Sequence, residues 1–550
     1  MNPITLKSTA LPLIVDRILR AVAAIEDGES CFMKKYPNDV NISKFHKYKK
    51  LMISEARTYL QNIPLHLLNE CVELVLKKFT TELNGYLSPP TKYYERYANL
   101  LDIIPLNRLS IFCDKWTDEL AIGSKWTELL FKKLAGCSRL ETLSVSEIPV
   151  FENEIISFSE MFKNFTHLTF LKIIPNELKK NYDISFNIVI ELVTQYCPKL
   201  RELHLTYNGK TLRNTESKIE DLVKCRNLVS LWLYDNSSTT TVENIDGLQK
   251  LLIELKNLKC LFHKDLKSAI LDPNKKISGT LGLEHLILRD DVFYDRDHEV
   301  NLNDLVQLSK ICPATRTLKL TQPPFNMDMV LTALPNLEIL DMDRCGYGIF
   351  PRLSSIPLHN LKVLKLKHVY DISYTHISQL AHNCPNLEVL DISFSMINAD
   401  GNLTLPPRQS LAFPHLKELT MVPMCYLRGF HSCHCKHRSW KIDKDLTQYL
   451  LRGSHNLERV HVHYRDSYYK PSSSFILEML ESLKRLTSLQ LVSSLDMPRD
   501  IIHEMVNRCP MLKELAAFDS WNFNTSMDEN IPKQIELMKY CKCVGIIPYR

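Results

Sequence analysis

The phrase L-x-x-L-x-L recurs along most of this chain, and it constrains the fold more than any other feature. Fourteen copies occur, several of them degenerate, with another residue in place of a leucine, and successive copies begin 22 to 41 residues apart. The copies begin at Leu140, Leu168, Leu200, Leu228, Leu258, Leu283, Thr315, Leu337, Leu361, Leu387, Leu416, Leu457, Leu486 and Leu512. Each copy predicts a short strand with alternate leucines facing a core, followed by a returning helix. Since one such unit cannot bury its own apolar face, neighbouring copies must stack.

Six of the 16 cysteines occupy one position of this repeat, at the end of the returning helix. They are Cys137, Cys197, Cys225, Cys312, Cys384 and Cys509, and four of them are followed by proline. A small, weakly polar side chain packs well at a buried helix end, and proline stops the helix before the next strand. We therefore interpret these cysteines as structural rather than as metal ligands or nucleophiles.

The segment Asn383-Cys-Pro-Asn-Leu-Glu-Val-Leu-Asp-Ile-Ser393 shows the full pattern. It closely resembles the cysteine-containing class of leucine-rich repeats, and the resemblance covers roughly residues 130–525. It implies an α/β leucine-rich-repeat solenoid, or horseshoe. The class is best known from F-box/leucine-rich-repeat substrate receptors of cullin-type (SCF-like) ubiquitin ligases, which hold proteins for ubiquitination and proteasomal degradation. By this resemblance the chain is a non-catalytic substrate receptor; the alternative is an interaction scaffold without a ligase role.

Residues 1–130 predict a small all-helical domain, because apolar residues recur there with helical spacing over 10–25 and 51–83. Ile63-Pro64 and the segment Leu109-Ser-Ile-Phe-Cys113-Asp-Lys-Trp116 look similar to the two ends of an F-box, although they lie about 50 residues apart. Leu67-Leu68-Asn-Glu-Cys71 is similar to the L-x-x-x-C motif of elongin-binding receptors. The resemblances imply docking on a Skp-type or elongin-type adaptor through these residues. The alternative is that the helices only cap the first repeat.

The outward positions of the predicted strands should line the concave face of the solenoid. In order they are Ser144, Lys172, His204, Trp232, Phe262, Ile287, Lys319, Asp341, Lys365, Asp391, Thr420, His461, Gln490 and Ala516, with Tyr234, Lys264, Arg289, Asp343, Lys367 and His463 beside them.

Aromatic and charged residues on this face indicate a protein-binding surface. Trp232, Tyr234 and Phe262, with Arg289 beside them, have the usual composition of a binding hot spot. Lys319, Asp341, Lys365 and Asp391 alternate in sign, which argues against a nucleic-acid track and fits a protein partner. We expect His461 and His463 to belong to the same surface. The alternative for the charges is that neighbouring strands pair them across the sheet.

One insertion, at about 423–445, holds several potential metal ligands. They are Cys425, His431, Cys433, His434, Cys435 and His437. Zinc takes four cysteine or histidine ligands, but this stretch lacks the paired spacing of known closed sites. We predict no metal and no cofactor; a zinc-dependent regulator and a basic surface insertion remain the alternatives for this segment.

Composition excludes several other classes. The net charge is only +5 and glycine is scarce, at 14 in 550 residues, so neither a nucleic-acid partner nor a glycine-rich nucleotide loop is indicated. No motif of a hydrolase, kinase or metalloprotease occurs, so we expect no enzyme activity. No window is apolar enough for a membrane span, and Asp16, Arg17 and Arg20 interrupt the first apolar stretch. We expect a cytoplasmic or nuclear protein organised as 1–130 (helical), 131–525 (repeats) and 526–550 (tail).

Overall fold

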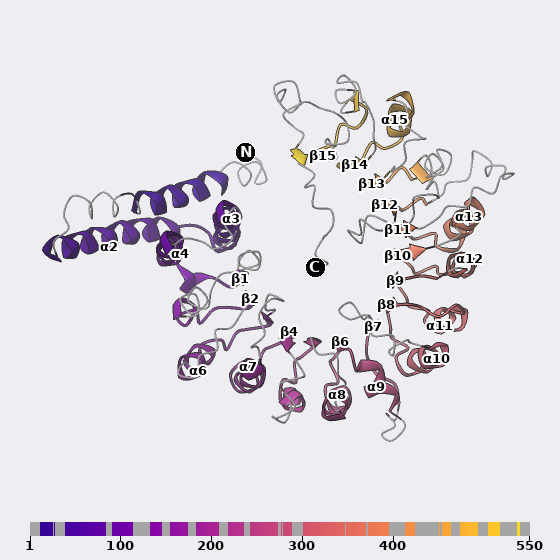
Figure 1. Cartoon of the computed structure of the whole chain (residues 1–550), viewed down its shortest axis with the longest axis horizontal. Helices are drawn as coiled ribbons and strands as arrows, with labels where there is room; N and C mark the ends of the chain where they lie inside the picture. Colours follow the sequence, from indigo (N-terminus) through magenta and orange to yellow (C-terminus); the bar gives the residue numbers. More distant parts are fainter. Residues whose placement is uncertain are drawn as a thin grey trace. The chain divides into compact units, whose positions relative to one another are not determined.

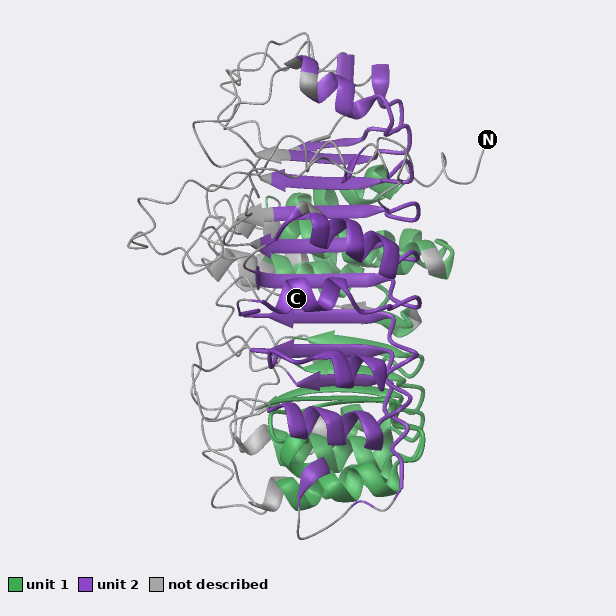
Figure 2. Cartoon of the chain, turned by 90° about the vertical axis from the view of Figure 1, so that its right-hand side faces the viewer, with its two compact units in different colours: residues 1–269 green, residues 270–550 purple. Residues whose placement is uncertain are grey.

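The computed structural model describes most of the repeats and parts of the N-terminal region. The described residues are 11–25, 27, 39–83, 91–113, 132–145, 155–173, 183–207, 218–235, 242–272, 277, 279–288, 301–346, 348–369, 372–394, 413–423, 450–451, 454–463, 473–492, 504–505, 507–516 and 536–538. They divide into two compact units, residues 1–269 (unit 1) and 270–550 (unit 2), which Figure 2 colours green and purple.

Unit 1 begins with helices and continues as a parallel sheet whose strands follow chain order. Helix 11–25 is followed by α2 (Asp39–Gln61), α3 (Leu65–Leu83), α4 (Thr91–Ile103) and the short η1 (Leu106–Arg108). The strands are β1 (Ile111–Cys113), β2 (Thr142–Val145), β3 (Phe170–Ile173), β4 (Glu202–Tyr207), β5 (Ser230–Asp235) and β6 (Cys260–Phe262). Between them lie α6 (Ile155–Lys163), α7 (Asp183–Tyr196), η4 (Lys218–Lys224) and α8 (Val242–Glu254), and α9 (Leu266–Leu271) follows β6.

Unit 2 repeats the same plan. Its strands are β7 (His285–Leu288), β8 (Thr317–Thr321), β9 (Ile339–Asp343), β10 (Val363–Val369), β11 (Val389–Phe394), β12 (Glu418–Pro423), β13 (Arg459–His463), β14 (Ser488–Val492), β15 (Glu514–Ala516) and β16 (Glu536–Met538). Its helices are α10 (Leu302–Ile311), α11 (Asp328–Thr332), α12 (Ile349–Ser354), α13 (Tyr374–Asn383) and α15 (Ser473–Leu480). Within each unit the helices that alternate with the strands lie on one side of the sheet (Figure 1). The α/β leucine-rich-repeat fold with an N-terminal helical region is therefore confirmed.

The repeat leucines form the core between strands and helices. Leu364 of β10 and Leu390 of β11 are paired in register and fully buried, and so is Leu387, which begins its copy of the repeat. The backbone joins neighbouring repeats in a constant way: the amides of Glu388 and Val389 both donate to the carbonyl of Lys362, at 2.8 and 2.9 Å. Burial of the same leucine positions in every repeat therefore builds one continuous core along each stack.

The cysteines of the repeat lie where the sequence predicts, at buried helix ends. Cys312 and Cys384 are the C-caps of α10 and α13, and both are fully buried. Burial raises the pKa of the Cys384 thiol to about 12. Nine described cysteines are buried free thiols: Cys71, Cys137, Cys197, Cys225, Cys260, Cys312, Cys345, Cys384 and Cys509.

An asparagine position, not predicted from the sequence, also links consecutive repeats. In unit 2 the side-chain amides of Asn360, Asn386 and Asn456 donate to backbone carbonyls of the preceding repeat, at 2.7 to 2.9 Å. In unit 1 Asn227 donates in the same way to the carbonyl of Pro198, at 2.9 Å. These bonds satisfy carbonyls in the tight turns that precede the strands.

Two strands lie outside the range expected for the repeats. β1 falls within residues expected to be helical, and it pairs with β2 through Ile111, Phe112 and Cys113. β16 falls within the expected tail and pairs with β15, with Leu537 opposite Leu515. The segment before β1 reads Leu106-Asn-Arg-Leu109-Ser-Ile111, but Phe112 rather than Leu109 is the register partner of Leu143, so the phrase is out of register. β16 has only Leu537 at a leucine position, so in both cases the pairing becomes evident only from the neighbouring strand. Among the described residues, no helix combines the length and the apolar run needed to cross a membrane.

Candidate functional site

The outward strand positions form one row in each unit, which we call the outward row. In unit 1, Ser144, Lys172, His204, Trp232 and Phe262 are register partners on successive strands. In unit 2 the row consists of Ile287, Lys319, Asp341, Lys365, Asp391, Thr420, His461, Gln490 and Ala516. The register of the strands therefore agrees with the alternation in the sequence, although Ser144 and Ile287 are buried, with 6% and 5% of their surfaces exposed.

The outward face of unit 1 carries an aromatic ladder, which consists of His204, Trp232 and Phe262 of the outward row and of Phe170 and Tyr234 beside it. His204 stacks on Trp232 with ring centroids 5.3 Å apart and planes 11° apart, and Phe262 stacks on the other side of Trp232 at 5.1 Å and 29°. Phe170 lies 5.5 Å from His204, and Tyr234 lies 5.1 Å from Phe262. All five side chains are half-buried. The sequence predicted three of these rings as a cluster, and the structure adds Phe170 and His204.

Hydrogen bonds to residues two positions earlier on the same strands hold the rings of Trp232 and His204 in place. The indole Nε1 of Trp232 donates to Ser230 Oγ at 2.9 Å. His204 Nε2 lies 2.7 Å from Glu202 Oε1, while its buried Nδ1 has no hydrogen-bond partner within the described part of the chain. Because these bonds use the polar edges of both rings, the surface left to solvent is mainly apolar.

The outward row of unit 2 is charged. Lys319 Nζ lies 3.9 Å from Asp341 Oδ2, and only 6% of Asp341 is exposed. Burial raises the pKa of the Asp391 carboxyl, while the charges of Lys365 and Lys367 act in the opposite direction. Opposite charges on neighbouring strands therefore compensate one another in part. This agrees with the alternative prediction, that neighbouring strands pair these charges across the sheet. Burial also lowers the pKa of His461, to about 4, so this side chain is neutral near pH 7.

At the ends of β9 and β10 a carboxylate and an imidazole form a polar contact that the sequence did not reveal. Asp343 Oδ1 lies 2.7 Å from His368 Nδ1 and also accepts the backbone amide of Arg344 at 2.7 Å. Gln322, Arg344 and His368, at the ends of three consecutive strands, have positive φ angles of 52°, 52° and 57°. Such angles are unusual for residues other than glycine, so local bonds must maintain this turn.

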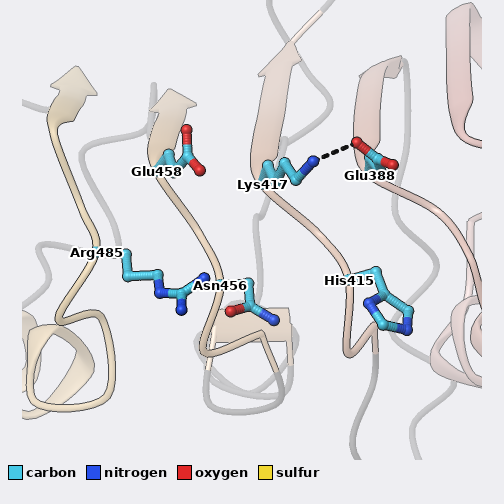
Figure 3. Close-up of a pocket in the computed structure, with 6 residues that line it drawn as sticks. All are labelled: Glu388, His415, Lys417, Asn456, Glu458 and Arg485. Atoms are coloured by element: carbon cyan, nitrogen blue, oxygen red, sulfur yellow. Dashed lines mark hydrogen bonds and ion pairs between the residues drawn. The ribbon is translucent and has the colours of Figure 1, made fainter.

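Charged side chains also alternate along the edge where the strands of unit 2 begin. A pocket of about 210 Å³ lies there, lined by Glu388, His415, Lys417, Asn456, Glu458 and Arg485. Figure 3 shows these six side chains. Lys417 Nζ lies 2.6 Å from Glu388 Oε2. A second pocket, of about 460 Å³, repeats the arrangement with Glu284, Ala314, Arg316, Asn336, Glu338, Asn360 and Lys362. There Glu338 contacts Arg316 at 2.7 Å and Lys362 at 3.0 Å. Both pockets are therefore lined by ion pairs between consecutive repeats.

Several of the candidate adaptor-docking residues lie in the core of unit 1. Leu68, Cys71 and Leu109 are fully buried, and only 7% of Ile63 is exposed. Pro64 is exposed and Leu67 is half-buried. The helical spacing that indicated an apolar face was correct, but that face packs against the rest of unit 1 rather than facing solvent.

Other apolar side chains of the helical region are exposed instead. On α2, 56% of Tyr48, 57% of Leu51 and 45% of Tyr59 is exposed, and Leu65 at the start of α3 is 40% exposed. The periodicity of the sequence could not separate them from core residues, because α2 carries apolar residues around much of its circumference.

The remaining candidate residues lie wholly or partly outside the described part of the chain. Trp116, Arg289 and the proposed metal ligands Cys425, His431, Cys433, Cys435 and His437 lie outside the described residues. Cys113 and His463 are described as parts of β1 and β13, without their side chains.

Comparisons with known proteins give likeness of structure only. No family model matches the sequence, and no curated protein matches it. Among solved structures, the yeast Rad7 and Elc1 complex is similar over 69% of this chain and 98% of that one, with 16% identity and a TM-score of 0.39. An internalin (InlF) of Listeria monocytogenes is similar over 70% of this chain and 82% of that one, with 14% identity and a TM-score of 0.29. At these values the likeness says nothing about what this chain binds.

Proposed function

We propose that this chain is a recognition subunit that binds a protein partner on the outward face of its sheet. The observation that carries the proposal is the aromatic ladder. Five rings of unit 1 gather on the side of the sheet away from the leucine core, and each keeps part of its surface in water. Clustered, half-buried aromatic side chains are the usual anchors of protein interfaces, since covering them releases much apolar surface from water.

The proposal assigns no catalytic group to the chain. A nucleophilic cysteine must ionise near neutral pH, whereas burial raises the pKa of Cys137, Cys197 and Cys384 to about 12. Under this proposal, chemistry on a bound protein resides in another subunit, and this chain contributes by holding the protein nearby.

We further propose that the N-terminal helices dock on an adaptor of a cullin-type ubiquitin ligase. The resemblance of the repeats to those of F-box/leucine-rich-repeat receptors motivates this step. The exposed side chains of Tyr48, Leu51 and Tyr59 offer an apolar helix surface of the kind that binds in a partner's groove. The docking residues would then lie on α2, not among the buried Leu68, Cys71 and Leu109.

Affinity purification of the tagged full chain followed by mass spectrometry tests the ligase role. Leu51→Glu places a charge in the exposed apolar surface of α2, and Lys50→Glu changes the charge of the neighbouring exposed residue as a control. We expect a cullin and its adaptor with the wild-type chain and with Lys50→Glu, and their loss with Leu51→Glu. Absence of any cullin from the wild-type sample would leave a recognition scaffold without a ligase role.

A further inference from the structure

The aromatic ladder cannot receive a flat ligand between its central rings. Trp232 has His204 stacked on one side and Phe262 on the other, at 5.3 and 5.1 Å, because these residues occupy the strands on either side of β5. With both ring faces covered, a nucleobase or a methylated ammonium group has no aromatic face of Trp232 to stack on. Ring edges remain, and these suit aliphatic and aromatic side chains of a protein.

The side chain of Lys172 places a positive charge next to the aromatic ladder, in the outward row of unit 1. Lys172 of β3 is the register partner of His204 and is half-buried. Within the described part of unit 1, Lys172 makes no ion pair or hydrogen bond, and the nearby carboxylate of Glu202 is engaged by His204 at 2.7 Å. The row therefore offers one uncompensated positive charge beside an apolar band.

The spacing of the strands sets the distance between the positive charge of Lys172 and the aromatic ring of Trp232. Lys172 and Trp232 are two strands apart, which corresponds to about 10 Å at about 4.8 Å per strand. In a polyproline II segment, which repeats every three residues and rises about 3.1 Å per residue, side chains i and i+3 face the same way about 9 Å apart. A β-strand puts i and i+3 on opposite faces, so it fits this distance less well.

We infer that the outward row of unit 1 binds a polyproline II-like protein segment with the pattern acidic-x-x-apolar, in either chain direction, its carboxylate at Lys172 and its large apolar side chain against Trp232. The inference rests on the proposed function and names the class of partner that unit 1 takes. Opposite charge at Lys172 would fix the orientation of the segment, and burial of the apolar side chain against the ring edges would supply most of the affinity.

Peptide selection tests the inference with a defined probe. A library of random linear twelve-residue peptides is selected on the immobilised full chain and, in parallel, on the Lys172→Glu and Trp232→Ala variants. Lys256→Glu serves as a matched control, because Lys256 is an exposed lysine of unit 1 in the turn before β6, off the outward row. We expect acidic-x-x-apolar peptides on the wild-type chain and on Lys256→Glu, basic-x-x-apolar peptides on Lys172→Glu, and loss of the apolar preference on Trp232→Ala.

A synthetic peptide of the selected sequence then gives the magnitude. Affinities are measured by fluorescence polarisation. We expect the Lys172→Glu variant to bind the acidic peptide at least tenfold more weakly than the wild-type chain does. We expect the same variant to bind a second peptide, in which lysine replaces the acidic residue, more tightly than the wild-type chain does. Failure to select any pattern, or the same acidic pattern on Lys172→Glu, would overturn the inference. Lys172→Glu alters a half-buried side chain at the edge of the ladder and leaves the stacked rings in place, so its result holds even if Trp232→Ala fails to fold. Cullin association, tested above through α2, is measured separately, so the two proposals fail independently.

Discussion

Replacing Asp343 by asparagine tests the electrostatics of unit 2 most sharply. Burial by itself would raise the pKa of the Asp343 carboxyl. The hydrogen bond and charge of His368, the amide of Arg344 and the charge of Lys367 outweigh it, and the pKa falls from 3.8 to about 2. Only 17% of the Asp343 side chain is exposed, so solvent screens these contacts little.

The size of the effect follows from this shift. A pKa lowered by about 1.8 units corresponds to about 2 kcal/mol of stability, at about 1.4 kcal/mol per unit. Because the folded-state pKa lies below the unfolded one, the contribution is fully present above pH 3.8 and disappears as the pH falls toward 2. Asp343→Asn should therefore be about 2 kcal/mol less stable at pH 7, and the difference from wild type should shrink below pH 4.

Urea unfolding between pH 7 and pH 2.5, followed by circular dichroism, measures this difference. Hydrogen exchange of peptides from β9 and β10 reports on the local effect, since a stack of repeats need not unfold in one step. Asp328→Asn, at an exposed position of α11, is the control and should change stability by well under about 1 kcal/mol. A difference that is absent at pH 7, or independent of pH, would refute the reasoning.

Three further predictions concern the packing of the repeats. Iodoacetamide at pH 8 should leave Cys384 unlabelled in the native protein and label it after denaturation, since burial raises its pKa to about 12; rapid native labelling, seen by mass spectrometry, would contradict its structural role. Gly348→Ala should lower stability by more than about 1 kcal/mol in thermal unfolding, because Gly348 has a φ of +77° and the ring of Phe325 fills the space beside it; an unchanged midpoint would count against this turn. Glu388→Lys should lower the urea midpoint, and adding Lys417→Glu should restore part of it, because the pair at 2.6 Å is re-formed in reverse; strictly additive effects would show that the contact contributes nothing.

The repeat, the outward row and the cysteine positions could be predicted because each rests on a periodic constraint. A leucine at a fixed place must be buried in every copy, and strand alternation then places Lys172, Trp232 and Lys365 on the opposite face. The same periodicity located Cys384 at a helix end.

Other features could not be predicted because they depend on contacts between distant or irregular segments. Leu68 and Cys71 follow the spacing of an exposed docking face equally well, and only packing shows that they are core. The contact between Asp343 and His368 needs a turn with positive φ at a residue that is not glycine, and sequence patterns do not signal such a turn. β16 has a single leucine in register with its neighbour, too little for a repeat phrase.

The central claim is that the aromatic ladder captures a protein partner. Quantitative affinity purification and mass spectrometry of the full chain, compared with Trp232→Ala and with Lys256→Glu, tests it most directly. Loss of a hot-spot anchor costs about 2 kcal/mol or more, so proteins bound through the ladder should fall at least about tenfold with Trp232→Ala. They should stay unchanged with Lys256→Glu, and proteins bound through α2 should stay in both samples. The same set of proteins at the same abundance with wild type and with Trp232→Ala, in a variant whose circular dichroism spectrum matches the wild type, would contradict the claim.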